Sequence, residues 1–150
     1  MNPIRKKTHP KRRNARRFAV QAVYQWQFTH AHEDEVLQEI FAREDFSVAS
    51  REYFSELVKG VITRSAELDA IFTPFLDRPI TELNPIELAV LRLACFELLV
   101  RIDIPYRVVI NEALELTKEF GTVEGYKYVN GVLDKIVQKV PRADLLRSGV

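Results

Sequence analysis

Apolar residues recur at three- and four-residue spacing along most of the chain, and this helical period is the feature that most limits the folds open to it. Strand-like alternation of apolar and polar residues is absent over any useful length, and no internal repeat is evident. A length of 150 residues suits one domain that buries its core without metal or disulfide. The sequence therefore predicts a single domain of the all-α class.

Six helices are expected from this period and from the signals at their ends. A serine cap at Ser47 or Ser50 opens the third helix, and Asn84 followed by Pro85 opens the fourth. Gly121 ends the fifth helix, and Pro141 follows the sixth. The expected spans are residues 14–28, 36–41, about 50–72, 85 to about 100, a fifth helix after the break at residues 103–105 that ends at Gly121, and a sixth from 122 or 123 to 140.

Gly131 is expected to lie inside the last helix, although an Asn-Gly pair is more typical of a turn. The apolar period from Tyr126 to Val140 continues through it, and the longer pattern overrides the local signal. A glycine in a helix costs about 1 kcal/mol relative to alanine. We therefore expect another backbone to approach Gly131 closely, as a compensation for this cost.

Charge is distributed unevenly along the chain. The first seventeen residues hold eight bases and no acid, whereas the chain as a whole has 22 bases and 21 acids. A basic segment attached to an acidic body indicates a polyanion partner, most simply a nucleic acid. The alternative is a solvated charged tail. We expect residues 1–11 to form a flexible basic tail and residues 12–150 to form the helical domain.

The polar side of the first helix is the first candidate site for a nucleic acid. Arg13 and Arg17 lie one turn apart, so their side chains can follow a phosphate backbone together. Gln21 continues this stripe, and Tyr24 at its end offers a ring for stacking. We expect that replacing Arg12, Arg13, Arg16 and Arg17 by alanine weakens RNA binding at least about tenfold and barely changes thermal unfolding.

A second candidate site lies at the start of the last helix. Lys127 and Tyr128 stand side by side, away from the apolar face and on the side of Glu124. An exposed Lys-Tyr pair can bind a phosphate and stack on a base. The alternative interpretation is that Tyr128 is a half-buried packing residue.

Charged residues of the acidic body allow two further interpretations. Arg92 follows an apolar run and is either a surface residue or the counter-ion of a carboxylate in a fixed network. The acidic surplus indicates either a landing area for a basic protein or a solvated surface. The acidic residues that make up this surplus include Glu33, Asp34, Glu35, Glu82, Glu87, Glu112 and Glu115.

Signatures of catalysis, metal binding and secretion are missing from the sequence. Cys95 is the only cysteine and lies in an apolar run, which favours a buried hydrophobe. The three histidines do not have metal-ligand spacing, and no phosphate-binding glycine motif or serine nucleophile motif occurs. No apolar stretch is long enough for a membrane span or a signal peptide. We expect a cytoplasmic protein that is not an enzyme and has no cofactor.

Four sequence blocks, in this order, resemble the NusB family of transcription antitermination factors. They run from about residue 12 to residue 137, and their spacing is preserved. The blocks are RRNARRFAVQAVYQW at residues 12–26, LAVLR at 88–92, IPYRVVINEA at 104–113 and YKYVNGVLD at 126–134.

The resemblance implies two three-helix subdomains that share the first helix, with a seventh short helix. It also implies binding of the boxA element in nascent RNA of bacterial ribosomal RNA operons, together with the ribosomal small-subunit protein NusE, so that RNA polymerase reads through terminators. The RNA surface implied by position comprises Lys11, Arg12, Arg13, Arg16, Arg17, Gln21, Arg92, Glu124, Lys127 and Tyr128. Tyr24, Glu82 and Glu87 are implied on the NusE side.

Two other functions remain open from the sequence. The first is a helical protein-interaction module, with homodimerisation as one form of it, in which the basic head only aids solubility. The second is a reader of duplex DNA, since short helices with a basic arm also occur in such proteins.

Overall fold

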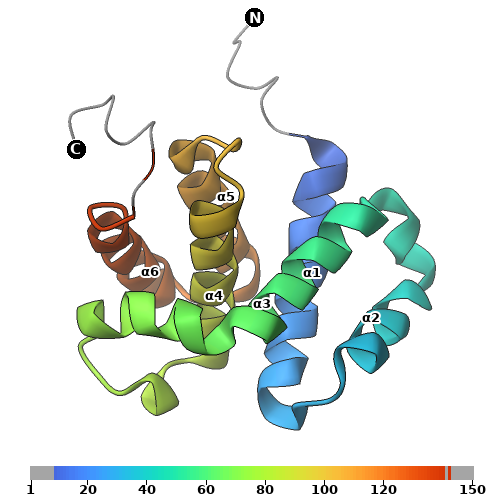
Figure 1. The fold of residues 1–150 in the computed structure, drawn as a ribbon, viewed down its shortest axis with the longest axis horizontal. Helices are drawn as coiled ribbons and strands as arrows, with labels where there is room; N and C mark the ends of the chain where they lie inside the picture. Colours follow the sequence, from blue (N-terminus) through green and yellow to red (C-terminus); the bar gives the residue numbers. More distant parts are fainter. Residues whose placement is uncertain (1–8, 141, 143–150) are drawn as a thin grey trace, which may run out of the picture.

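The computed structural model describes residues 9–140 and 142, and within them it contains six α-helices, three short 3-10 segments and no strand (Figure 1). The prediction of an all-α fold is confirmed. In chain order the elements are α1 (Pro10–Thr29), α2 (Glu33–Phe41), η2 (Glu44–Val48), α3 (Arg51–Phe72), η3 (Thr73–Phe75), η4 (Ile80–Glu82), α4 (Pro85–Val100), α5 (Tyr106–Phe120) and α6 (Val123–Ile136).

Side-chain caps explain where three of the helices begin. The side chains of Ser50, Asn84 and Thr122 accept hydrogen bonds from backbone N–H groups in the first turns of α3, α4 and α6, at 3.1, 2.8 and 2.9 Å. Each bond satisfies a donor that has no partner inside the helix. Of the two serines that the sequence offered for α3, Ser50 is the cap.

Two helix boundaries differ from expectation. α1 begins at Pro10, four residues before the expected start, because proline is well suited to the first helical position. The expected domain boundary at residue 12 therefore lies inside α1, and Lys11 is helical. The remainder of the expected tail, residues 1–8, is outside the described residues. α6 ends at Ile136, four residues before the expected end.

α4 is the central helix of the fold, and α1, α3, α5 and α6 all pack against it. Ten of its sixteen residues are buried, which explains why its sequence is apolar on nearly every side. α1 contacts α2 and α3 on one side and α4 and α5 on the other, so it is shared by the two groups of helices (Figure 1). Within the described residues, the helical segments other than the six α-helices are the short 3-10 helices η2, η3 and η4, so no seventh α-helix is present there.

The expected core residues are buried with few exceptions. Cys95 is 1% exposed, as its apolar surroundings predicted. Tyr126 and Val140 are half-buried, although the apolar period placed them in the core. Aromatic rings from α1, α2, η2 and α3 meet edge to face, with centroids 5.1–5.6 Å apart, and so join the N-terminal helices. The rings belong to Phe18, Phe41, Phe46 and Phe54.

The expectation for Gly131 is half right. It lies inside α6, but it is exposed, and no atom lies within 4 Å of the place where its Cβ would be. No other described backbone approaches it. The close approach occurs at Gly60 on α3, where a Cβ would meet the ring of Phe96 on α4 at 2.0 Å. The absence of a side chain at Gly60 thus lets α3 approach the ring of Phe96 on α4.

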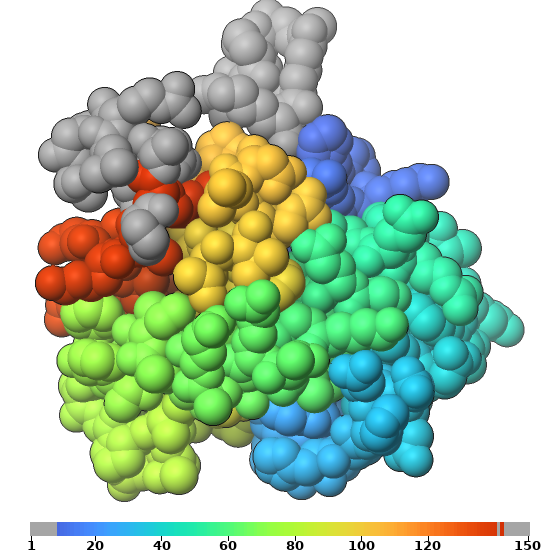
Figure 2. Space-filling model, in the orientation of Figure 1, coloured from blue at the N-terminus to red at the C-terminus, as the bar shows by residue number. Residues whose placement is uncertain are grey.

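α5 and the beginning of α1 lie at the same end of the molecule. In the space-filling view the gold surface around residue 100, at the end of α4, borders that of α3, and the first turns of α1 lie beside both (Figure 2). This arrangement brings the basic start of α1 next to α5, which contains three glutamates (Glu112, Glu115 and Glu119) and one lysine (Lys118). Among the described residues, no helix is both long and apolar enough to cross a membrane.

Candidate nucleic-acid interface

The first turn of α1 concentrates positive charge at the positive end of a helix dipole. It holds Lys11, Arg12 and Arg13 and no acidic residue. Cations at a helix N-terminus are unfavourable by about 0.3–1 kcal/mol each, so this arrangement does not stabilise the helix. The apolar face of α1, packed against α3 and α4, must supply that stability. The result is a helix end that is electrostatically suited to an anion.

Lys11 and Arg12 are differently placed at this end. Lys11 is exposed. Arg12 is half-buried, with its guanidinium 5.0 Å from the ring centre of Tyr53, in a cation-π arrangement. A groove of about 370 Å³ lies beside it. The groove is lined by His9, Arg12, Arg16, Asp103, Ile104, Pro105 and Val108.

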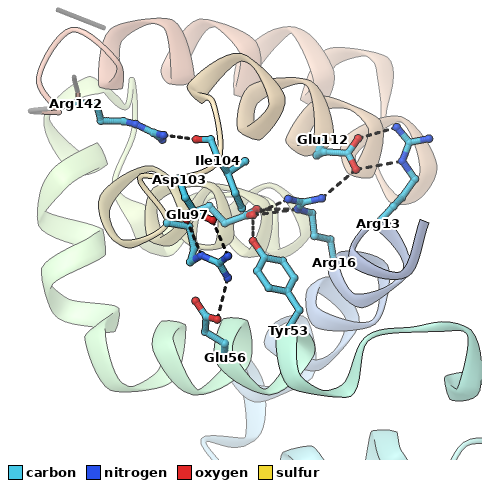
Figure 3. A network of polar contacts seen from close by, with 10 residues as sticks. Arg13, Arg16, Tyr53, Glu56, Glu97, Asp103, Ile104, Glu112 and Arg142 are labelled. Atoms are coloured by element: carbon cyan, nitrogen blue, oxygen red, sulfur yellow. Dashed lines mark hydrogen bonds and ion pairs between the residues drawn. The ribbon is translucent and has the colours of Figure 1, made fainter. Parts of the chain in front are cut away.

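Arg16 is buried, which differs from its expected place on the RNA surface (Figure 3). Its Nε and Nη2 donate to the carboxylate of Glu97 on α4 at 2.9–3.1 Å, and its Nη1 donates to Glu112 on α5 at 3.2 Å. Burial acts to lower the pKa of Arg16, but the charge and hydrogen bonds of Glu97 outweigh it and raise the pKa. Arg16 therefore ties α1 to α4 and α5.

Tyr53 of α3 completes this buried network. Its hydroxyl donates to the carboxylate of Glu97, and burial followed by the charge of Glu97 raises its pKa. Arg101 stands 5.0 Å from the centre of the same ring and bonds Glu56 at 3.0 Å and Asp103 at 2.9 Å. The hydrogen bond from Arg101 lowers the pKa of Asp103 to about 2. The network fixes the α4–α5 turn beneath the start of α1.

Arg13 is bound to the same carboxylate as Arg16. Its Nη2 and Nε donate to the two oxygens of Glu112 at 2.7 and 3.1 Å, while its own side chain stays 44% exposed. Glu112 is 2% exposed. The expectation that Glu112 contributes to an acidic landing area for a partner is therefore wrong, because its carboxylate faces the arginines of α1.

Arg17 and Gln21 continue the polar stripe of α1. Arg17 forms an ion pair with Glu119 of α5 at 2.6 Å. The side-chain oxygen of Gln21 accepts from Arg43 at 2.9 Å, and its nitrogen donates to the backbone oxygen of Arg17 at 3.0 Å. A groove of about 250 Å³ runs between α1 and α5 at this point. It is lined by Arg13, Arg16, Arg17, Glu112, Glu115, Leu116, Lys118 and Glu119.

Sequence reasoning missed Glu119 and Lys118, which line this groove. The signal was present, because Glu112, Glu115 and Glu119 recur at three- and four-residue spacing and so share one face of α5. What the sequence did not show is that this face lies opposite the arginines of α1.

Lys118 connects the groove to the start of α6. It also lines a second hollow, together with Tyr126 and residues 121–123 at the α5–α6 turn. Its Nζ stands 5.7 Å from the ring centre of Tyr126. Glu124 is exposed directly after this turn. The groove between α1 and α5 and the hollow at the α5–α6 turn thus share Lys118.

The α6 region itself is partly a packing site. Lys127 is exposed, whereas Tyr128 is half-buried, as one of the two interpretations held. The hydroxyl of Tyr128 accepts from the backbone N–H of Asp77 at 3.3 Å, and Arg78 lies 4.9 Å from its ring centre. Burial raises the pKa of Tyr128. Tyr128 thus packs against the loop before η4 and remains partly exposed.

Arg92 is the counter-ion of a carboxylate, which decides between its two interpretations. It makes two hydrogen bonds to Asp69 of α3, at 2.9 and 2.8 Å, and one to Gln27 at 3.2 Å. Its side chain is 13% exposed. Arg92 lies beside Trp26 in the last turns of α1, away from the basic first turn.

The residues implied on the protein-partner side have different exposures. Tyr24 is half-buried and meets the exposed ring of Phe28 edge to face, with centroids 5.1 Å apart. Glu82 is exposed in η4, whereas Glu87 is 8% exposed and burial raises its pKa. A Cβ on Gly125 would lie 2.8 Å from the Glu87 carboxylate, so α4 and α6 touch there.

Metal-binding geometry is missing in the part of the chain that the structure describes. No group of three or more His, Cys, Asp or Glu side chains is placed there to hold an ion.

Comparison with known proteins identifies the family. The family model described as NusB family matches residues 13–138. A transcription antitermination protein NusB of Nitrosococcus oceani is 51% identical over 138 residues, which cover 92% of each chain. One of Alcanivorax borkumensis is 49% identical over 133 residues, which cover 89% of each.

Solved structures of similar fold agree with this result. NusB of T. maritima has a TM-score of 0.81 and 30% sequence identity, and the match covers 91% of this chain and 96% of that one. A complex of the antitermination factors NusB and NusE with dsRNA gives a TM-score of 0.74 and 26% identity, over 86% and 97% of the two chains. On the family match, the curated relatives and the shared fold together, this chain belongs to the NusB family.

Proposed function

We propose that this protein is a transcription antitermination factor that binds the boxA element of nascent ribosomal RNA transcripts together with NusE. In this role it helps RNA polymerase to read through terminators in the bacterial cytoplasm. It acts by assembly and catalyses no reaction. Relatives at about half identity carry the name of antitermination proteins, and a structural relative forms a complex with NusE and RNA.

The observation that carries the RNA-binding role is the basic first turn of α1 with the groove beside it. Lys11 and Arg13 are exposed, and Arg12 and Arg17 are partly so. Lysine and arginine neutralise phosphates and release counterions, which gives affinity for any strand. Bases of the strand can then stack on the guanidinium planes of the α1 arginines and on the ring of Tyr128 beside Lys127.

The route of the RNA follows from how these residues are joined. The surface passes from the first turn of α1 along the α1–α5 groove and past Lys118 to the α5–α6 turn. We propose that the strand continues from there to Glu124 and Lys127, which are exposed on α6. We place the strand on this surface. Arg16 supports it from beneath, since its guanidinium group is held by carboxylates. Arg92, which is bound to Asp69 near the last turns of α1, lies outside this route.

The partner surface lies at the other end of α1. Tyr24 and the exposed ring of Phe28 offer apolar contact, and the exposed Glu82 supplies negative charge, whereas Glu87 is buried and offers little of its carboxylate to a partner. An acidic surface with aromatic anchors suits a basic protein such as a ribosomal subunit protein. NusE is the partner that we propose for it.

A homodimer is a second state that we propose for the free protein. The same charged groove and exposed aromatic residues can meet a second copy when RNA and NusE are absent. Light scattering across a range of protein concentrations measures the mass of the free protein. A constant monomer mass would remove this state from the proposal.

A gel shift with boxA RNA tests the proposed function. The protein is titrated into labelled boxA RNA with and without NusE, and the controls are a scrambled strand of equal length, the same RNA as a duplex, and duplex DNA. We expect single-stranded boxA to bind most tightly, with higher affinity in the presence of NusE. Failure to shift boxA with NusE at low salt, or equal binding of the scrambled strand, would contradict the proposal.

A further inference from the structure

The ion pair between Arg17 and Glu119 has the geometry of an arginine that holds a phosphate. Arg17 Nε lies 2.9 Å from both carboxylate oxygens of Glu119, and Nη2 lies 2.6 Å from one of them. Two parallel N–H groups of a guanidinium fork fit a carboxylate and a phosphate in the same way. Glu119 thus occupies the position that an RNA phosphate on Arg17 needs.

We propose that Glu119 competes with RNA phosphates for Arg17 and thereby sets the affinity of the α1 surface for RNA. This inference rests on the RNA-binding role proposed above. When the strand binds, one phosphate replaces the carboxylate on the guanidinium fork, and Glu119 turns to solvent. Part of the energy of the phosphate contact is therefore used to break an existing ion pair.

Exposure is what makes this exchange feasible. The side chains of Arg17 and Glu119 are 41% and 39% exposed, so water can solvate the released carboxylate. Exposed ion pairs contribute little to stability, so the pair opens at small cost. The hydrogen bond to Glu119 also raises the pKa of Arg17, as expected for a guanidinium in direct contact with a carboxylate.

The other acidic residues of the groove are not placed for this exchange. Glu112 is 2% exposed and is shared by Arg13 and Arg16, so it is part of the fixed interior. Glu115 lies 3.6 Å from Lys118, on its own helix. Among the carboxylates that line the groove, Glu119 alone is both solvent-accessible and bound to a predicted RNA-binding arginine.

A double-mutant cycle tests the competition directly. The affinity for labelled boxA RNA, with NusE present and near 0.15 M salt, is measured for the unchanged protein, Glu119→Gln, Arg17→Gln and the double variant. We expect Glu119→Gln to raise the affinity about two- to fivefold, which is the range that an exposed ion pair supplies. In the Arg17→Gln background, the same change is expected to have no effect.

A charge-matched control separates competition from a general change in charge. Glu67→Gln on α3 removes one exposed carboxylate outside the α1–α5 groove, where it likewise forms an exposed ion pair with an arginine, and it is expected to leave the affinity unchanged, because salt screens distant charges. Thermal unfolding verifies that each variant is folded. An equal rise with Glu119→Gln in both backgrounds, or no rise in either, would overturn the inference. Absence of boxA binding by the unchanged protein would overturn the proposed function instead.

Discussion

The guanidinium of Arg16 lies 2.9 Å from the carboxylate of Glu97, and both side chains are about 95% buried. The pair joins α1 to the central helix, and Glu112 of α5 is bound to the same guanidinium. Its neighbours Arg13 and Arg17 carry the same charge but reach solvent. Three arginines within about one turn of α1 are thus placed differently: Arg16 lies in the interior, and Arg13 and Arg17 lie at the surface.

Replacing Arg16 by glutamine is expected to destabilise the protein by about 3–5 kcal/mol, since two buried carboxylates then lose a charged partner. Urea unfolding measures this loss. Arg17→Gln, which breaks only an exposed pair, is expected to cost less than about 1 kcal/mol. Similar losses for the two variants would show that Arg16 does not have the structural role described here.

Replacing Gly131 by alanine is expected to stabilise the protein by about 0.5–1 kcal/mol, because the position is helical and its surroundings are open. The matched variant Gly60→Ala should instead destabilise it by about 1–3 kcal/mol, since the added Cβ meets the ring of Phe96. Thermal unfolding of both variants checks the prediction. A loss of stability with Gly131→Ala would indicate a close contact that the structure does not contain.

Replacing Glu87 by glutamine is expected to raise stability in a way that depends on pH. Burial raises the folded-state pKa of Glu87, so its ionised form is disfavoured in the folded protein. The gain from the neutral amide should therefore be absent below the ordinary glutamate pKa of about 4.3 and should grow as pH rises through the folded-state pKa. Unfolding at about pH 4 and pH 7 measures it.

Glu82→Gln is the control for this prediction, because Glu82 is exposed on the neighbouring η4. It should change stability by less than about 0.5 kcal/mol at either pH. If Glu87→Gln raised the free energy of unfolding equally at both pH values, the gain could not come from removing a buried ionised carboxylate. If Glu87 also contacts NusE, the stabilised variant should bind NusE more weakly.

The salt dependence of RNA binding should report how many cations contact the strand. The predicted RNA-binding cations whose own side chains are at least partly exposed, away from the buried Arg16 and Arg92, are Lys11, Arg12, Arg13, Arg17 and Lys127. For a single strand, each phosphate contact contributes about −0.7 to the slope of log affinity against log salt concentration. Contacts from all five cations should therefore give a slope near −3.5. A series of titrations between about 50 and 200 mM salt gives the slope. A slope near zero would contradict electrostatic capture.

Most of the fold was predictable from the sequence because helices depend on local signals. Asn84, Pro85 and Thr122 mark helix starts through hydrogen bonds and backbone angles that involve only their neighbours. The period of apolar residues then identifies the core face of each helix. These features do not depend on where the other helices lie.

The pairing of charges was not predictable in the same way. Glu112 and Glu119 contact residues of α1 that are about a hundred positions earlier, and no local pattern specifies that contact. One signal for Arg16 was present in the sequence. It lies three, four and seven positions before Ala19, Val20 and Val23, which are all buried, so it belongs to the buried side of α1.

That signal also changes an expectation. Alanine at all four arginines from Arg12 to Arg17 should not leave thermal unfolding nearly unchanged, since Arg16 is part of the interior. A test of the RNA surface must keep Arg16 in place.

The most direct test of the account is the affinity of boxA RNA, with NusE present, for a variant in which Lys11, Arg12 and Arg17 are all glutamine, so that Arg13 and Arg16 keep their bonds to the buried Glu112. Fluorescence anisotropy of labelled RNA gives the affinity, and urea unfolding of the same protein gives its stability. We expect binding at least about tenfold weaker than that of the unchanged protein, with stability within about 1 kcal/mol. Equal affinity in a folded variant would contradict the claim that the basic face of α1 binds RNA.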